Sequence, residues 1–170
     1  MSELLAPKFL TKVLAQKAVQ MVLESVMFSS SGAPLKRKAC YIVVLVPGMD
    51  MSAGENAWPN FPCKPVALYE HKVRQEDWSD DYKTIAQCKA LQRWHDRSDG
   101  GTDVSPHLLY TGDTPFWGAV KRQGIVVSCS GIQPYFDRMI AGMIADAIIG
   151  FAYHAWAISQ DKTDGVLFLT

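Results

Sequence analysis

The sequence predicts an α+β domain, in which helices pack on an antiparallel sheet, rather than a doubly wound parallel sheet. Helix and strand patterns do not alternate regularly: the order is helix, two strands, helix, two or three strands, helix. The last two predicted strands are joined by Arg122-Gln123-Gly124, and so short a connection favours an antiparallel hairpin. With 170 residues, nearly half of them apolar, the chain suits one domain over residues 1–170 with a substantial core.

The N-terminal part predicts a helix followed by a buried strand. Residues 7–28 begin with Pro7, which the first turn of a helix tolerates. Apolar residues follow at three- and four-residue spacing, as one face of a helix requires. These residues are Leu10, Val13, Leu14, Ala18, Met21 and Val22. The polar segment "SSSGAPLKRK" ends the helix. Residues 39–46, "ACYIVVLV", are β-branched and bounded by Pro47-Gly48, which is typical of a buried strand.

The remaining elements are predicted from turn-forming and capping residues and from the spacing of apolar residues. Residues 47–65 are rich in Pro, Gly and Asn and are long for a plain connection, so we expect a functional or interface loop. Residues 79–94 open with a Ser/Asp cluster suited to an N-cap and continue with helical spacing. The other predicted elements are a strand over 66–73, a loop over 95–106, strands over 107–111, 116–122 and 124–130, a helix over 139–158, and a tail over 159–170.

The composition favours a neutral protein with reduced cysteines. Lysine plus arginine and aspartate plus glutamate each number 17, so the whole chain has no electrostatic reason to bind nucleic acid or an anionic membrane. The four cysteines form no C-x-x-C pair and no zinc pattern with histidine. The first residues lack the unbroken apolar core of a secretory signal. We therefore expect a cytoplasmic protein without disulfides and without a metal site.

The apolar stretch 139–158 has the length of a membrane span, about 20 residues. Asp146 near its middle would cost about 3 kcal/mol in a bilayer, so we expect a buried helix and no membrane span. A helix this apolar around its circumference needs cover on several sides. In a small chain a partner subunit can supply that cover, so we expect a homo-oligomer, a dimer or higher.

The segment "SCSGIQPYFDRM", residues 128–139, joins the last predicted strand to the last helix. Gly131 indicates a backbone conformation or a close approach that a Cβ would hinder. Pro134 fits a first helical turn, and Asp137 places a carboxylate near the positive end of the helix dipole. These features are expected of a structural joint. The amides of residues 131–136 leave a second interpretation open, a site for a carboxylate or phosphate group.

Two further positions leave alternatives open. Cys129 follows a strand and precedes a helix, where some hydrolases hold a nucleophile, but "VSCSG" lacks the G-x-S/C-x-G elbow, so a buried structural thiol is favoured. Asp113, in "TGDTPFWGAVKR", favours an Asx-type turn. Its functional interpretation is that Asp113, Phe116 and Trp117 rim a pocket for a planar ligand.

Three segments resemble the GlcG/HbpS-like family, also called heme-degrading-domain proteins. They are "TIAQCKA", "GDTPFWGAV" and "GIVVSCSGIQPYFDRMIAGMIADA". The first resembles the I-A-x-x-K-A core of a family helix, the second loosely resembles a G-G-x-P segment, and the third resembles a strand, turn and helix with S-G-x-x-P-x-x-D. The matching positions are Ile85, Ala86, Lys89, Ala90, Gly112, Pro115, Gly118, Gly124, Ser130, Gly131, Pro134 and Asp137. The resemblance covers residues 80–150 well and the first 75 residues by order of elements.

The resemblance implies a profilin-like α/β/α layered fold, dimers or higher oligomers, and, in some members, binding of heme or a corrinoid-related ligand. A heme ligand needs an imidazole in an apolar pocket, and His71 and His95 are the better candidates among the four histidines. We therefore expect a small-ligand-binding protein, with heme or a related tetrapyrrole as its candidate cofactor. The candidate ligand-binding residues are His71, His95, Asp113, Phe116, Trp117, Ser130 and Gly131. The alternatives are a structural or adaptor protein without a small ligand, and a small enzyme that uses Cys129 or Asp113.

Overall fold

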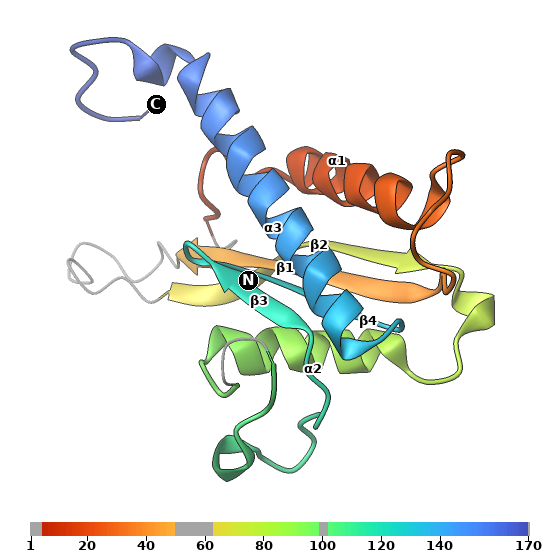
Figure 1. The fold of residues 1–170 in the computed structure, drawn as a ribbon. Helices are drawn as coiled ribbons and strands as arrows, with labels where there is room; N and C mark the ends of the chain where they lie inside the picture. The colour runs from red at the N-terminus through yellow and green to blue at the C-terminus, as the bar shows by residue number, and fades with distance from the viewer. Residues whose placement is uncertain (1–4, 50–62, 99–101, 170) are drawn as a thin grey trace.

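The structure, a computed structural model, describes residues 5–49, 63–98 and 102–169. It confirms the predicted α+β class, with helices packed on both faces of an antiparallel sheet (Figure 1). The described α-helices are α1 (Lys12–Leu23), α2 (Tyr82–Trp94) and α3 (Pro134–Ala157). The described strands are β1 (Cys40–Met49), β2 (Cys63–Val73), β3 (Ala119–Arg122) and β4 (Ile125–Ser130). A π-helical turn, η1 (Glu24–Phe28), extends α1, and 3-10 turns lie at η4 (Gln75–Asp77), η5 (Pro106–Leu108) and η6 (Gln160–Lys162).

The four strands form one sheet in the order β2-β1-β4-β3, and every neighbouring pair is antiparallel. Arg122 lies opposite Ile125, so β3 and β4 form the hairpin that the short connection predicts. β1 lies between β2 and β4 and is buried along nearly all of its length. A strand that is buried on both faces needs apolar residues at every position, which explains its continuous apolar sequence.

Alternate residues of β1 face two separate cores. Ile42 and Val44 pack with residues of α1 and α3, whereas Tyr41 and Val43 pack with residues of α2. Figure 1 shows the same division, with α1 and α3 on one side of the sheet and α2 on the other. The domain therefore has three layers, helix, sheet and helix, with the sheet in the middle.

Helix α3 begins at Pro134 rather than at residue 139, and Pro134 occupies its first turn as its missing N–H favours. Its buried residues lie between Asp137 and Ile148, and the part that follows, toward Ala157, projects past the sheet (Figure 1). Among the described helices, α3 is long and apolar enough to cross a membrane by length and composition, and 33% of that stretch is buried within the domain.

The predicted strand over residues 107–111 is wrong. Pro106–Leu108 form the turn η5, and residues 109–118 form no strand. The Leu108 carbonyl accepts a hydrogen bond of 3.2 Å from the Arg97 guanidinium. A side chain thus satisfies the polar backbone that a neighbouring strand would otherwise have to pair. The predicted strand over 116–122 is shorter than expected, because β3 begins at Ala119.

The strands β1 and β2 extend into the predicted loop at 47–65. β1 continues to Met49, and β2 begins at Cys63 rather than at residue 66. Pro47 lies opposite Pro65 in the register. Two prolines can face each other where a residue pair exchanges no N–H···O bonds, so neither one breaks its strand. The rest of the predicted loop, residues 50–62, lies outside the described residues.

Candidate functional site

The turn between β4 and α3 is built on Gly131. Its φ is +131°, a conformation that favours glycine, and a Cβ added there would lie 2.9 Å from both the Cys40 Cα and the Tyr82 Cδ2, and closer still to the Ala39 carbonyl oxygen. The predicted close approach is confirmed: β1 and α2 both press against this position. A side chain at residue 131 would therefore push the turn away from the sheet.

Asp137, in the first turn of α3, is buried and binds its own helix start. Its Oδ1 accepts a hydrogen bond of 3.1 Å from the Ile132 amide, and its Oδ2 lies 3.0 Å from the Lys89 Nζ. Burial raises the pKa of the Asp137 carboxyl, while the Lys89 ammonium and the hydrogen bonds act in the opposite direction. The Asp137 carboxylate thus supplies the negative charge that the start of α3 favours. This supports the interpretation of the segment as a structural joint.

Lys89 is the partner that the sequence did not reveal. It extends from α2 and is buried together with Asp137, with 2% and 4% of the two side chains exposed. Its Nζ also donates to the Cys129 carbonyl, at 3.0 Å. One ammonium therefore connects α2, β4 and α3. The two positions stand in the "TIAQCKA" and "GIQPYFD" segments, but nothing in their spacing indicates that they pair.

A cleft of about 400 Å³ opens beside this joint, and we call it the Phe116 cleft. Phe116, with 52% of its surface exposed, contributes an aromatic side chain. Tyr82 and Ile85 contribute apolar surface from α2, and Ser130 and Gly131 contribute the turn. The remaining lining residues are Arg37, Ser79, Asp80, Lys89, Ile132, Gln133, Pro134 and Asp137. Of the predicted ligand-binding residues, the cleft brings together Phe116, Ser130 and Gly131.

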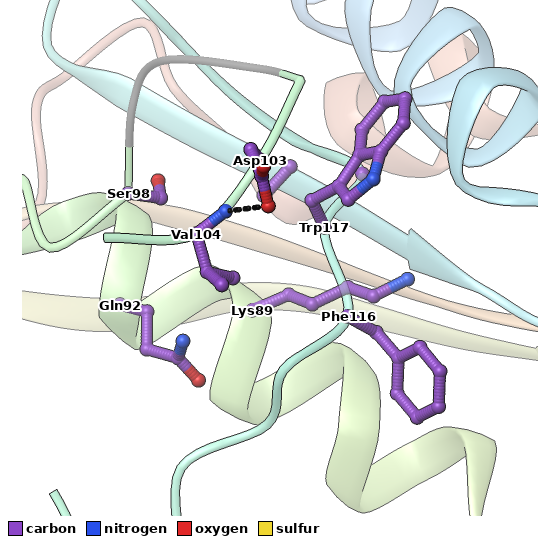
Figure 2. Close-up of a pocket in the computed structure, with 9 residues that line it drawn as sticks. Lys89, Gln92, Ser98, Asp103, Val104, Phe116 and Trp117 are labelled. Atoms are coloured by element: carbon purple, nitrogen blue, oxygen red, sulfur yellow. Dashed lines mark hydrogen bonds between the residues drawn. The ribbon is translucent and has the colours of Figure 1, made fainter. Parts of the chain in front are cut away.

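A second hollow, which Lys89 and Phe116 also line, lies between α2 and the segment that enters β3 (Figure 2). Its volume of about 10 Å³ gives room for about one water molecule. Figure 2 shows Phe116 and Trp117 leaving the chain in opposite directions. Trp117 lines this small hollow and is absent from the residues that line the Phe116 cleft.

A pair of hydrogen bonds positions Phe116. The Gln92 side chain, which is 2% exposed, donates to the Thr114 carbonyl at 3.0 Å and accepts from the Thr114 amide at 2.9 Å. The Phe116 amide in turn donates to the Thr114 hydroxyl at 3.3 Å. The segment before β3 is therefore fixed to α2, although it belongs to no strand. No sequence pattern indicated a role for Gln92, because a glutamine on a helix is most often exposed.

Asp113 is engaged in a turn. Its carboxylate forms an ion pair with the Arg97 guanidinium and accepts a hydrogen bond of 2.7 Å from the Tyr110 amide. The hydrogen bond from Arg97 and the one from the Tyr110 backbone lower the pKa of the Asp113 carboxyl. Asp113 is not among the described residues that line the Phe116 cleft.

His71 and His95 lie on opposite faces of the sheet. His71 stands opposite Ile42 and thus on the face that α1 and α3 cover, whereas His95 follows the last residue of α2 and is exposed. The His71 Nδ1 lies 3.0 Å from the Tyr69 hydroxyl, and burial lowers the pKa of the His71 imidazole. Neither histidine is among the described residues that line the Phe116 cleft.

Cys129 lies in the core between the sheet and the helices α1 and α3, with Ile125 and Val127 on the same strand face. It is 0% exposed. A hydrogen bond with the Cys40 thiol, together with burial, raises the pKa of the Cys129 thiol well above its ordinary value. A buried thiol that stays protonated is a poor nucleophile, so this position favours the structural interpretation.

Within residues 5–49, 63–98 and 102–169, no group of three or more His, Cys, Asp or Glu side chains is arranged to hold a metal ion. No family model, no curated protein and no solved structure matches the chain. The resemblance to the GlcG/HbpS-like family therefore stays a prediction.

Proposed function

We propose that this chain is a small-ligand-binding protein and that the Phe116 cleft is its binding site. The observation that carries the proposal is the convergence in one cleft of an exposed aromatic ring, the apolar surface of Tyr82 and Ile85, and the Ser130–Gly131 turn. Binding sites for small molecules are concave and mostly apolar, with a few polar groups that fix orientation, and span about 300–1,000 Å³. The cleft, at about 400 Å³, falls within that volume range and combines apolar with polar lining residues.

The ligand class that we propose is planar and partly apolar. Phe116 offers a ring face for stacking, and Ser130 offers a hydroxyl near the turn. The resemblance to GlcG/HbpS-like proteins supports heme or a related tetrapyrrole as the candidate, in a cytoplasmic protein of profilin-like fold. No histidine is among the described lining residues. A tetrapyrrole held here would therefore depend on Phe116 and the turn, and not on His71 or His95.

A hemin titration followed by the Soret absorbance tests this proposal. We expect a saturable band with the wild type. Phe116→Ala should lower the affinity for hemin at least about fivefold, because a stacking surface is lost. Phe28→Ala is the matched control, since Phe28 is also exposed, at 42%, and does not line the cleft. His71→Ala and His95→Ala should titrate like the wild type. Loss of the band in either histidine variant, with Phe116→Ala unchanged, would move the site out of the cleft.

A second proposal, the structural or adaptor function through a homo-oligomer, is favoured by the far end of α3. Tyr153 and Ile158 are 66% and 73% exposed there, and Leu167 and Phe168 in the tail are 85% and 82% exposed. Contiguous exposed apolar patches mark interaction sites, and these four residues belong to the end of α3 and the tail that follows it. Light scattering on the wild type and on the double variant Ile158→Glu/Phe168→Glu tests it. We expect an oligomer that the double variant dissociates, and a monomeric wild type would contradict this proposal.

A further inference from the structure

We propose that the ligand of the Phe116 cleft carries an acidic group and that Arg37 binds this group. The inference rests on the proposed function, because it assigns a chemical class to the ligand of the same cleft. Arg37 lies in the connection between α1 and β1, far in sequence from the segments that resemble a known family.

Arg37 lies where two grooves meet. It lines the Phe116 cleft, and it also lines a neighbouring groove of about 400 Å³ that includes Lys36, Gln133 and Phe136. Its Nη1 donates a hydrogen bond of 3.2 Å to the Ile132 carbonyl, in the turn that forms one wall of the cleft. This bond engages one of the five guanidinium donors at the junction of the grooves, and Arg37 is an exposed residue.

The charges around the cleft single out Arg37. Lys89 also lines the cleft, but the Asp137 carboxylate compensates its charge within the buried pair. Among the described residues, Arg37 forms no ion pair, and the group that it contacts is a neutral carbonyl. Lys36 adds a second positive charge along the adjoining groove. An acidic group on the ligand would supply the charge that the protein itself does not place opposite Arg37.

The N-terminus of α3 does not supply this site. The Ile132 amide at that end is already bound by the Asp137 carboxylate, at 3.1 Å. Asp80, an exposed residue at the cleft, acts against an acidic ligand. The planar fork of an arginine matches a carboxylate or sulfonate with two parallel hydrogen bonds, which a lysine cannot reproduce. The recognition that we propose is therefore a paired contact between Arg37 and the acid, beside the ring of Phe116.

Two fluorescent probes of the same aromatic skeleton separate this inference from the proposed function. Anilinonaphthalene sulfonate carries an acidic group, and phenylnaphthylamine is its neutral counterpart. With the full chain, we expect Phe116→Ala to lower the affinity for both probes, because both stack on the ring. We expect Arg37→Gln to lower the affinity for the sulfonate at least about tenfold, as loss of a hydrogen bond to a charged group does, and to leave the affinity for the neutral probe unchanged. Lys38→Gln is the matched charge control, since the Lys38 Nζ lies over the Phe28 ring, 5.7 Å from its centroid, and not in either groove.

The outcomes are distinguishable. If Phe116→Ala changes neither probe, the cleft is not the site and the proposed function fails. If Phe116→Ala lowers the affinity for both probes but Arg37→Gln changes neither affinity, the cleft binds ligands without recognising an acidic group. The inference on Arg37 is then overturned. Equal weakening of both probes by Arg37→Gln also overturns it, because Arg37 would then act by holding the turn at Ile132. Asp80→Asn should tighten the sulfonate alone, and weaker binding there would contradict the charge argument.

Discussion

At the scale of single residues, Gly131 determines how closely the site is packed. Its positive φ and the atoms of Cys40 and Tyr82 at 2.9 Å from a hypothetical Cβ act together. Gly124, in the hairpin between β3 and β4, also has a positive φ, +88°, but no atom lies within 4 Å of a Cβ built there. The two glycines therefore separate the cost of backbone conformation from the cost of a steric clash.

We predict that Gly131→Ala lowers the free energy of unfolding by about 2–4 kcal/mol, because backbone strain and overpacking add. Gly124→Ala should cost about 1–2 kcal/mol, from conformation alone. Urea unfolding followed by circular dichroism measures both. Equal losses in the two variants would mean that the close approach at Gly131 contributes nothing.

His71 gives the stability a pH dependence of known sign. Burial lowers the pKa of its imidazole below the ordinary value of 6.5, so the unfolded chain binds the proton more readily than the folded chain. We predict that the free energy of unfolding of the wild type falls as the pH drops from about 6.5 through the lower pKa of folded His71. The free energy of unfolding of His71→Gln should fall less over the same pH range. Urea unfolding at several pH values compares the two proteins. Identical slopes would show that His71 titrates alike in both states.

At the scale of elements, the buried pair of Lys89 and Asp137 connects α2, β4 and α3 at the edge of the cleft. We predict that Lys89→Met lowers the free energy of unfolding by about 3–5 kcal/mol, because Asp137 is left buried without its partner. Lys89→Met/Asp137→Leu should lose less than the sum of the two single variants. Additive losses in urea unfolding would indicate that the pair is not coupled.

The sequence predicted local features of these elements better than their long-range contacts. The roles of Pro134 in the first helical turn and of Gly131 in the turn before it were predictable. A missing N–H and a missing Cβ have their effects within a few residues along the chain. The sequence could not show that Gln92 fixes the segment before Phe116, since that depends on which residues the fold brings beside α2. The prediction of a strand at 107–111 was wrong for a related reason. The side chain of Arg97, from another segment, donates a hydrogen bond to the Leu108 carbonyl.

At the scale of the whole molecule, three layers place the predicted site residues apart. Because helices cover both faces of the sheet, His71 and His95 are separated by the sheet itself. Phe116, Ser130 and Gly131 meet because α2 and the start of α3 both adjoin the end of β4. The sequence indicated the aromatic and turn residues as candidates, but only the layer order shows which of them share a cleft.

The most direct test of the central claim is an amide NMR titration of the full chain with anilinonaphthalene sulfonate. We predict that the largest shift changes fall on the amides of residues that line the Phe116 cleft: Ser130, Gly131, Ile132, Gln133, Asp137, Phe116, Tyr82 and Ile85. Changes confined to the exposed apolar tail at 166–169, or no saturable change at the cleft, would contradict the account.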